Sequence, residues 1–395
     1  MQRSIIALLA LVVILVSLAG IAAQAPGAAD ASPTPREPTA GDYLLEGDAA
    51  FEAGDYEGAV DAYGRAIELA PELATAYVRR GDAYVNLGED GRALADYDRA
   101  IELAPQLAET HARRGEVNYR LGRNRAAVAD YDRAIELDLT LVSAYLNRGA
   151  AYNELGEYER AIDDFDRAIE LDDELAAAYY NRANANFNLE RWEAAVDDYT
   201  RAIELGSDLG PAHYSRGNAY FNLGEFELAI ADYDEAIERR TEPALSHYHR
   251  GNAYLNLADY ERAIDDYDDA VRLNPELAPA YLNRGLAYAA LEQYGRAIAD
   301  YDEAIALDDE IVAAYQNRGD AHFELEEFDE AIADYDDAIA LDDEIAAVWY
   351  NRALAKTRIG QLDEALADLA RALELAIEPG LIEQIEGLIE ELEGA

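Results

Sequence analysis

The chain has 395 residues and no cysteine, and its 82 acidic and 32 basic side chains give a formal net charge of −50. The lack of cysteine excludes disulfides, zinc–thiolate sites and cysteine nucleophiles. Binding to DNA, RNA or an anionic membrane surface depends on Lys and Arg, so this charge argues against nucleic acid as a partner. The acidity fits a highly soluble protein, adaptation to a salty medium, or binding to basic partners.

The N-terminal segment predicts export. Arg3 precedes an apolar run over residues 5–23 that ends in small residues, and the next charge is Asp30. A basic start, an apolar stretch and small residues are typical of a signal peptide, although the run is also nearly long enough to span a bilayer. We therefore expect residues 1–23 to be a cleaved signal peptide or an N-terminal membrane anchor. Either one places the remaining chain outside the cytoplasm, after a flexible linker over 24–39 that is rich in Ala and Pro.

Ten segments of 34 residues follow one another over residues 40–379 without insertion or deletion. Such a period predicts an array of small units that bury their apolar faces against one another. In the copy 142–175, the spacing of Tyr145, Gly149 and Tyr152 places them on one face of a first helix. Gly156 follows as a helix stop, and a second helix then carries Ala, Phe and Ala at the same kind of spacing.

This pattern resembles the tetratricopeptide repeat, which has aromatic residues at positions 4, 11 and 24, Gly or Ala at position 8, and Ala at positions 20 and 27. The proline that is frequent at position 32 of the family is matched by Pro71, Pro105 and Pro275. The resemblance implies an all-α, right-handed superhelical solenoid of tandem antiparallel helix pairs, whose first helices line the concave side. It also implies binding without catalysis, and the sequence shows no catalytic constellation.

Position 7 departs from the family, which usually has Leu there. Nine of the ten repeats carry Arg at position 7, and the same nine carry Asp at position 23. A buried, unpaired charge costs several kcal/mol, so we expect an ion pair between the two helices of each repeat. Among them are Arg148 with Asp164, Arg182 with Asp198, and Arg216 with Asp232. The alternative is that these arginines bind anionic ligands.

A second stripe of the first helix, at positions 6, 9 and 13, is rich in asparagine. Side-chain amides both donate and accept hydrogen bonds, so a row of them could hold the backbone of an extended peptide. The stripe resembles, in residue type and position, the asparagine ladder of O-linked N-acetylglucosamine transferases. The alternatives are amide contacts between neighbouring repeats, or a solvated face. The candidate groove residues are Asn147, Asn181, Asn184, Asn188, Asn218, Asn222, Asn252, Asn256, Asn283 and Asn317.

The remaining polar clusters predict no cofactor and no metal site. Four of the five histidines replace aromatic residues at core positions, and His247 and His249 diverge on one helix because they are two residues apart. The acidic repeat junctions lack the glycine and the alternating ligands of a calcium-binding loop. They are expected to be solvated turns.

The last segment, 380–395, has Leu381, Ile385, Leu388 and Leu392 on one face and predicts a helix that caps the final repeat. Taken together, the sequence predicts an exported, non-catalytic scaffold that binds a protein or an extended peptide in its concave groove. The alternative is a membrane-tethered structural or assembly factor of an envelope or secretion complex, which acts through its acidic surface.

Overall fold

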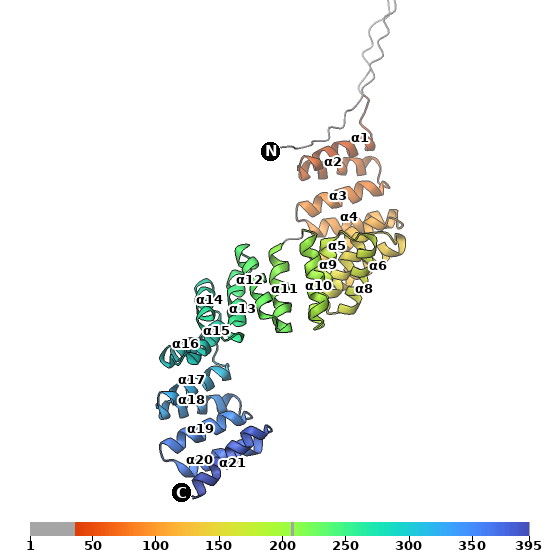
Figure 1. The fold of residues 1–395 in the computed structure, drawn as a ribbon. Helices are drawn as coiled ribbons and strands as arrows, with labels where there is room; N and C mark the ends of the chain where they lie inside the picture. The colour runs from red at the N-terminus through yellow and green to blue at the C-terminus, as the bar shows by residue number, and fades with distance from the viewer. Residues whose placement is uncertain (1–35, 207–208, 395) are drawn as a thin grey trace, which may run out of the picture.

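The computed structural model of the chain describes residues 36–206 and 209–394 (Figure 1). Within these ranges the backbone forms 21 α-helices and no strand, so the predicted all-α fold is confirmed. The signal or anchor predicted at 1–23 lies outside the described residues, as do residues 24–35 of the predicted linker. None of the described helices is both long and apolar enough to cross a membrane.

Each repeat contributes two helices. The first helices are α1 (Ala40–Glu52), α3 (Ala74–Asn86), α5 (Ala108–Arg120), α7 (Val142–Glu154), α9 (Ala176–Asn188), α11 (Leu209–Leu223), α13 (Pro243–Asn256), α15 (Ala278–Ala290), α17 (Val312–Glu324) and α19 (Ala346–Arg358). The second helices are α2 (Tyr56–Leu69), α4 (Asp90–Leu103), α6 (Asn124–Leu137), α8 (Tyr158–Leu171), α10 (Trp192–Glu204), α12 (Phe226–Glu238), α14 (Tyr260–Leu273), α16 (Tyr294–Leu307), α18 (Phe328–Leu341) and α20 (Leu362–Leu375).

The start of the array is fixed by a reciprocal cap. The hydroxyl of Thr39 accepts a hydrogen bond from the backbone N–H of Asp42, and the carboxylate of Asp42 accepts one from the backbone N–H of Thr39. This capping box satisfies two backbone donors that the first turn of a helix otherwise leaves unpaired. Helix α1 therefore begins at Ala40, where the first repeat is predicted to begin.

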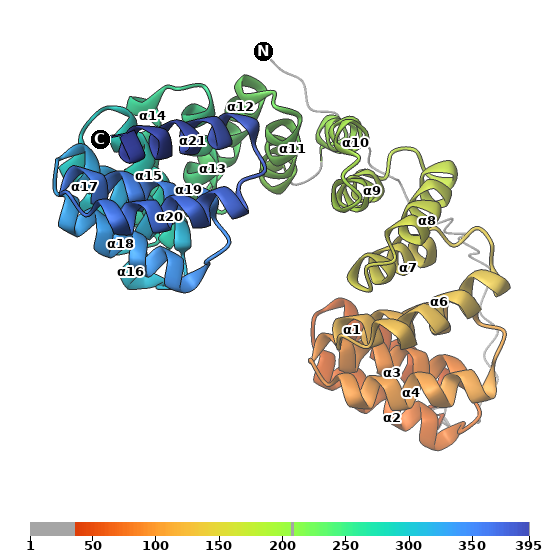
Figure 2. The ribbon, with the colours of Figure 1, turned by 90° about the horizontal axis from the view of Figure 1, so that it is seen from below.

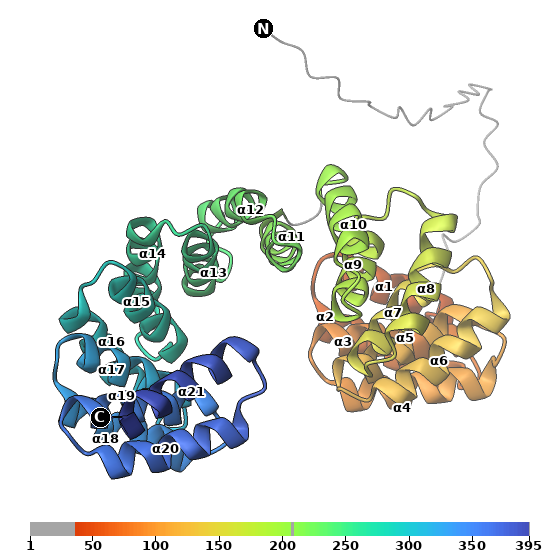
Figure 3. The same cartoon turned by 60° about the horizontal axis from the view of Figure 1, so that its bottom comes forward.

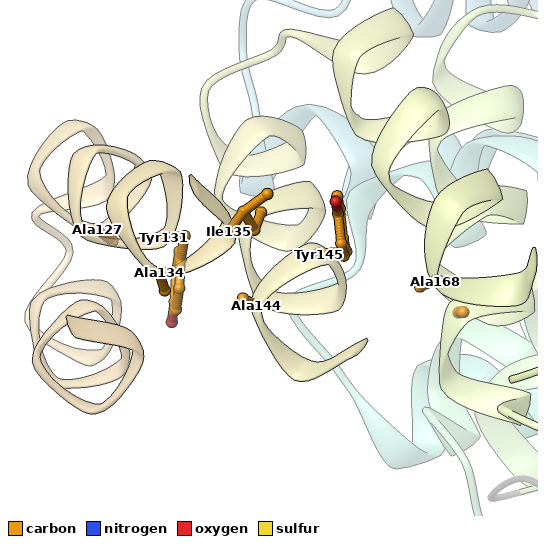
Figure 4. Close-up of a cluster of buried hydrophobic side chains, with 8 residues drawn as sticks. Ala127, Tyr131, Ala134, Ile135, Ala144, Tyr145 and Ala168 are labelled. Carbon is orange, nitrogen blue, oxygen red and sulfur yellow. The ribbon is translucent and has the colours of Figure 1, made fainter. Parts of the chain in front are cut away.

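Small residues let the two helices of a repeat approach closely. A β-carbon built on Gly149 would lie only 2.7 Å from the ring of Phe165, and Ala161 and Ala168 are fully buried. The apolar core continues from one repeat into the next. In the cluster of Figure 4, Tyr131 on α6 and Tyr145 on α7 are buried with the alanines of α6, α7 and α8. Each repeat thus buries its apolar surface on its neighbours, as the period predicts.

The stacked pairs form an elongated superhelix with α1 at one end and α21 at the other (Figure 1). Turned views show the middle helices arching between the two end bundles (Figures 2 and 3). From α5 to α19, each first helix packs directly on the next first helix, whereas no two second helices do so to a comparable extent in the described part of the chain. Because the inner elements of a curved stack lie closest together, the first helices line the concave side.

Repeat position 15 adopts the left-handed conformation in all ten repeats and ends each first helix. Six repeats have glycine there, with φ of 70–81°, and the predicted glycine stop is confirmed at Gly54, Gly88, Gly122, Gly156, Gly224 and Gly360. The other four repeats force a side chain into the same conformation, with φ of 57–61°, at Glu190, Ala258, Glu292 and Glu326. A left-handed residue with a β-carbon costs about 1–2 kcal/mol.

Glycine substitution at these four sites should therefore stabilise the protein. Each of the changes Glu190→Gly, Ala258→Gly, Glu292→Gly and Glu326→Gly is expected to raise the free energy of unfolding by about 0.5 kcal/mol, since strain relief exceeds the added chain entropy. The matched reverse change, Gly156→Ala, should lower it by about 1 kcal/mol. Urea denaturation followed by circular dichroism measures both, and a loss of stability in Glu292→Gly would contradict the expectation.

Helix α21 (Pro379–Gly394) covers the last repeat. Ile385 is fully buried, and Leu381, Leu388 and Leu392 pack with it against the side chains of α19 and α20. The opposite face of α21 carries glutamates, several of them exposed. The apolar end of the array is therefore closed by a polar outer surface, which terminal repeats require for solubility.

Candidate functional site

Each arginine at repeat position 7 forms a two-pronged ion pair with the aspartate sixteen residues later in the same repeat. Arg148 donates from Nε (2.8 Å) and Nη2 (2.6 Å) to the two carboxylate oxygens of Asp164, which is 4% exposed. Burial raises the pKa of Asp164, and the hydrogen bonds and charge of Arg148 oppose that rise. The nine pairs are Arg80–Asp96, Arg114–Asp130, Arg148–Asp164, Arg182–Asp198, Arg216–Asp232, Arg250–Asp266, Arg284–Asp300, Arg318–Asp334 and Arg352–Asp368.

A second carboxylate, which the sequence analysis missed, binds most of these arginines. Nη1 of Arg148 donates to Asp132 of the preceding repeat at 2.7 Å. Seven of the nine arginines have such a partner; the exceptions are Arg216, which donates to the Thr200 hydroxyl at 2.9 Å, and Arg80, whose repeat neighbour is Gly64. The recurrence of aspartate at position 25 was the available signal: Asp98, Asp132, Asp166, Asp234, Asp268, Asp302 and Asp336. These arginines therefore bind carboxylates of the chain itself, as the predicted ion pairs require.

The asparagines at position 9 link the two helices of their repeats. Their Oδ1 atoms accept hydrogen bonds from the tyrosine hydroxyl fifteen residues later, at 2.7–2.8 Å: Asn184 from Tyr199, Asn218 from Tyr233 and Asn252 from Tyr267. Aspartate takes the same role in Asp48, Asp82 and Asp320. Where position 9 is Ala150, the tyrosine is replaced by Phe165, which has no hydroxyl to satisfy. The side-chain amide nitrogen of Asn184 makes no hydrogen bond in the described residues, so it can donate to a ligand.

The other candidate asparagines have mixed roles. Asn188, Asn222 and Asn256 donate to the backbone carbonyl four residues earlier at 2.8–2.9 Å, and their side chains are exposed. Asn283 donates to Oδ1 of Asn252 at 2.9 Å, which is a contact between neighbouring repeats. The backbone carbonyl of Asn181 accepts from Asn153. Asn147 and Asn317 are half-buried on α7 and α17. Some asparagines of the stripe therefore join helices through hydrogen bonds, and others lie on an accessible surface.

The tyrosine hydroxyl at repeat position 24 should contribute to stability only in repeats whose residue at position 9 can accept its hydrogen bond. Tyr199→Phe is expected to lower the free energy of unfolding by about 1 kcal/mol, because the carbonyl oxygen of Asn184 loses its donor. Tyr301→Phe should leave the stability nearly unchanged, since Leu286 occupies position 9 of that repeat. Urea denaturation of the two variants makes the comparison, and equal losses would contradict it.

Three candidate asparagines meet in one cavity of about 370 Å³. Asn181, Asn184 and Asn188 of α9 line it together with Tyr119 of α5 and Tyr158 of α8. Ala150, Asn153 and Glu154 of α7 complete the wall. Amide donors beside tyrosine rings and a carboxylate can bind the polar backbone and the apolar side chains of an extended polypeptide.

An aromatic cluster interrupts the stripe farther along. The ring of His249, at position 6 of α13, stacks on Tyr233 at a centroid distance of 6.0 Å and meets the edges of Tyr214 and Tyr248 at 5.8 and 5.1 Å. Burial lowers the pKa of His249 to about 4. The imidazole is therefore neutral at physiological pH and forms part of the packed wall of the groove.

Two further histidines, His213 and His247, support the helices. Nδ1 of His213 lies 2.7 Å from Asp232, and Nδ1 of His247 lies 2.9 Å from Asp266, so both rings contact the aspartates of the ion pairs. Across residues 36–206 and 209–394, no three or more His, Asp or Glu side chains are grouped so as to hold a metal ion.

The fold and groove define a helical repeat protein with a polar concave surface. Family models named "TPR repeat" match residues 47–88, 81–122, 119–156 and 319–360, and models named "Tetratricopeptide repeat" match 142–175, 176–208, 210–240, 244–277, 278–310 and 346–376. The chain belongs to the tetratricopeptide repeat family. Proteins of this family are generally non-catalytic scaffolds that bind proteins or peptides.

Solved structures of other repeat proteins are similar over parts of the chain. MamA is 25% identical over 42% of this chain and 91% of its own, with a TM-score of 0.40. YrrB, described as a TPR protein with an unusual peptide-binding site, is 26% identical over 47% of this chain and 95% of its own, with a TM-score of 0.43. Yeast Tom70 is 17% identical over 90% of this chain and 95% of its own, with a TM-score of 0.40. A comparison with curated protein sequences gives no match.

Proposed function

We propose that the protein is an exported, non-catalytic scaffold that binds a protein or an extended peptide in the groove lined by its first helices. The observation that carries this proposal is the series of cavities along the first helices, of about 300 Å³ at α1 and α3, 370 Å³ at α7 and α9, and 290 Å³ at α17 and α19. Each is lined by amides or carboxylates next to aromatic rings on packed helices. Such sites suit hydrogen bonding to a polypeptide backbone.

A selection with random peptides tests the groove. A library of dodecapeptides displayed on phage is passed over the purified protein, and we expect defined sequences to be enriched. Replacing Asn181 and Asn188 with Ala should reduce that enrichment, because both side chains line the central cavity without joining the two helices of their repeat. Glu170→Ala, on the exposed side of α8, is the control. Enrichment that is unchanged in the Asn181→Ala, Asn188→Ala variant would place peptide binding outside this cavity.

Export is supported by the basic start and apolar run of residues 1–23. We expect residues 1–39, fused to alkaline phosphatase, to give enzyme activity in a bacterial host, because this reporter folds only outside the cytoplasm. An inactive fusion would refute export. Washing the membranes at alkaline pH then distinguishes the two forms of export. A protein whose signal peptide is cleaved is released, whereas one with an uncleaved N-terminal anchor stays with the membranes.

A further inference from the structure

Three repeats carry aspartate at position 9, and two of these aspartates bind an arginine of the next repeat. In all three, Oδ1 accepts a hydrogen bond from the tyrosine hydroxyl of the same repeat. Oδ2 of Asp48 accepts from Nη1 of Arg79, and Oδ2 of Asp82 accepts from Nη1 of Arg113 at 3.0 Å. Both arginines stand at position 6. The chain thus shows twice how this carboxylate binds a guanidinium.

The third aspartate, Asp320, has no such partner. Asn351 stands at position 6 of the next repeat, and its amide donates to Oδ1 at 2.9 Å, the same atom that receives the Tyr335 hydroxyl at 2.7 Å. Oδ2 makes no hydrogen bond or ion pair with any residue in 36–206 or 209–394. Burial raises the pKa of Asp320, while the bonds from Tyr335 and Asn351 lower it. A bound cation would compensate the cost of burying this charge.

The cavity beside Asp320 repeats the one that holds Arg79. The first cavity, of about 300 Å³, is lined by Asp48, Phe51, Glu52, Tyr63, Arg79 and Asp82. The second, of about 290 Å³, is lined by Asp320, Phe323, Glu324, Tyr335, Asn351 and Leu354. Both cavities therefore have the same residue types, Asp, Phe, Glu and Tyr, at repeat positions 9, 12, 13 and 24. The two cavities differ at two positions: Asn351 replaces Arg79, and Leu354 replaces Asp82. With Asn351 in place of an arginine, Oδ2 of Asp320 lacks the guanidinium that Arg79 provides to Oδ2 of Asp48.

We propose that the cavity at Asp320 binds an arginine side chain of a partner polypeptide that lies in the groove. This inference rests on the proposed function, since it names the chemistry that the groove recognises near its C-terminal end. The guanidinium takes the place that Arg79 has beside Asp48, with its charge on Oδ2 of Asp320. Glu324 adds a second carboxylate at the rim, next to Phe323, whose ring already carries the guanidinium of Arg358 at 5.7 Å from its centroid. Arginine fits better than lysine because its planar fork can bind both carboxylates at once.

Two variants and a control separate this site from the general acidity of the protein. Asp320→Asn keeps the fold, because Asn252 already receives the same two hydrogen bonds, from Tyr267 and Asn283. Asn351→Arg supplies an arginine from the chain itself to Oδ2 of Asp320, as Arg79 does for Asp48. Asp329→Asn removes the same charge as Asp320→Asn, but at an exposed position of α18. All are tested with the phage-displayed dodecapeptide library, in about 0.3 M NaCl to screen long-range attraction.

We expect the unmodified protein and Asp329→Asn to select peptides that carry arginine at one position about tenfold more often than the starting library does. A charge-assisted hydrogen bond to a buried carboxylate is strong enough to give an enrichment of this size. Asp320→Asn and Asn351→Arg should still enrich peptides but without that arginine. If all four proteins enrich arginine equally, the attraction is general and the inference is wrong, although the groove still binds peptides. If the unmodified protein enriches no sequence, the proposed peptide-binding groove fails, and this inference fails with it.

Discussion

Arg148→Leu should lower the free energy of unfolding by about 3–5 kcal/mol, although leucine is the usual residue of the family at this position. The reason is the aspartate that remains. Asp164 is 4% exposed and receives both prongs of the Arg148 guanidinium, so the substitution leaves a carboxylate buried without a cation. Native-state hydrogen exchange of the α7 and α8 amides, together with urea denaturation, measures the loss where it occurs.

Two further variants show whether the unpaired carboxylate of Asp164 causes this loss of stability. Asp164→Ala should cost less than Arg148→Leu, because Arg148 keeps Asp132 at 2.7 Å. The double variant Arg148→Leu, Asp164→Ala should be more stable than Arg148→Leu alone, since it removes the unpaired carboxylate. If the single arginine variant is no less stable than the double variant, Asp164 does not depend on the ion pair.

Acidification from pH 7.5 to pH 5 should destabilise the protein by about 2 kcal/mol through His249 alone. Its pKa is about 4 in the folded protein, because the ring is buried among tyrosines, and about 6.5 in an unfolded chain. The unfolded state therefore binds a proton first as the pH falls. The stability contributed by the neutral ring is present above pH 6.5 and is lost as the pH falls toward 4.

His249→Asn isolates this contribution. Asparagine occupies the same repeat position in Asn283, Asn317 and Asn351, so the helix accepts it there. The difference in unfolding free energy between the two proteins, measured at several pH values, should change by about 2 kcal/mol between pH 7.5 and pH 5. A difference that is independent of pH would mean that the imidazole titrates normally in the fold.

The fold could be predicted because the same residue types recur at the same positions of successive repeats. The period predicts ten units, the residue spacing within a unit predicts two helices, and glycine at position 15 marks the end of the first helix in six of the ten repeats. The contacts inside one repeat could also be inferred, since helical spacing places Arg148 and Asp164 on facing sides of two adjacent helices. Local geometry is sufficient for these contacts, and no knowledge of the curvature of the array is needed.

Contacts between repeats could not be predicted in the same way. Whether Asp132 reaches Arg148, or Arg79 reaches Asp48, depends on how far each repeat rotates on the previous one, which spacing within a helix does not specify. The role of position 9 could have been found in the sequence, because Ala150 coincides with Phe165 where other repeats pair Asn or Asp with Tyr. The sequence leaves open whether the asparagines bind a peptide, join neighbouring repeats or face solvent, and the structure divides them between contacts that join helices and an accessible surface.

Thr200 stands where seven other repeats have an aspartate, so Arg216 joins its repeat to the previous one through a neutral hydroxyl. The hydrogen bond is still charge-assisted through the guanidinium, but this junction lacks the attraction between opposite charges that an aspartate provides. In a linear array, cooperativity between neighbours is transmitted only across such interfaces, and the weakest one limits it. This junction lies between two blocks of five repeats, and we expect it to transmit less cooperativity between them than it would with an aspartate in place of Thr200.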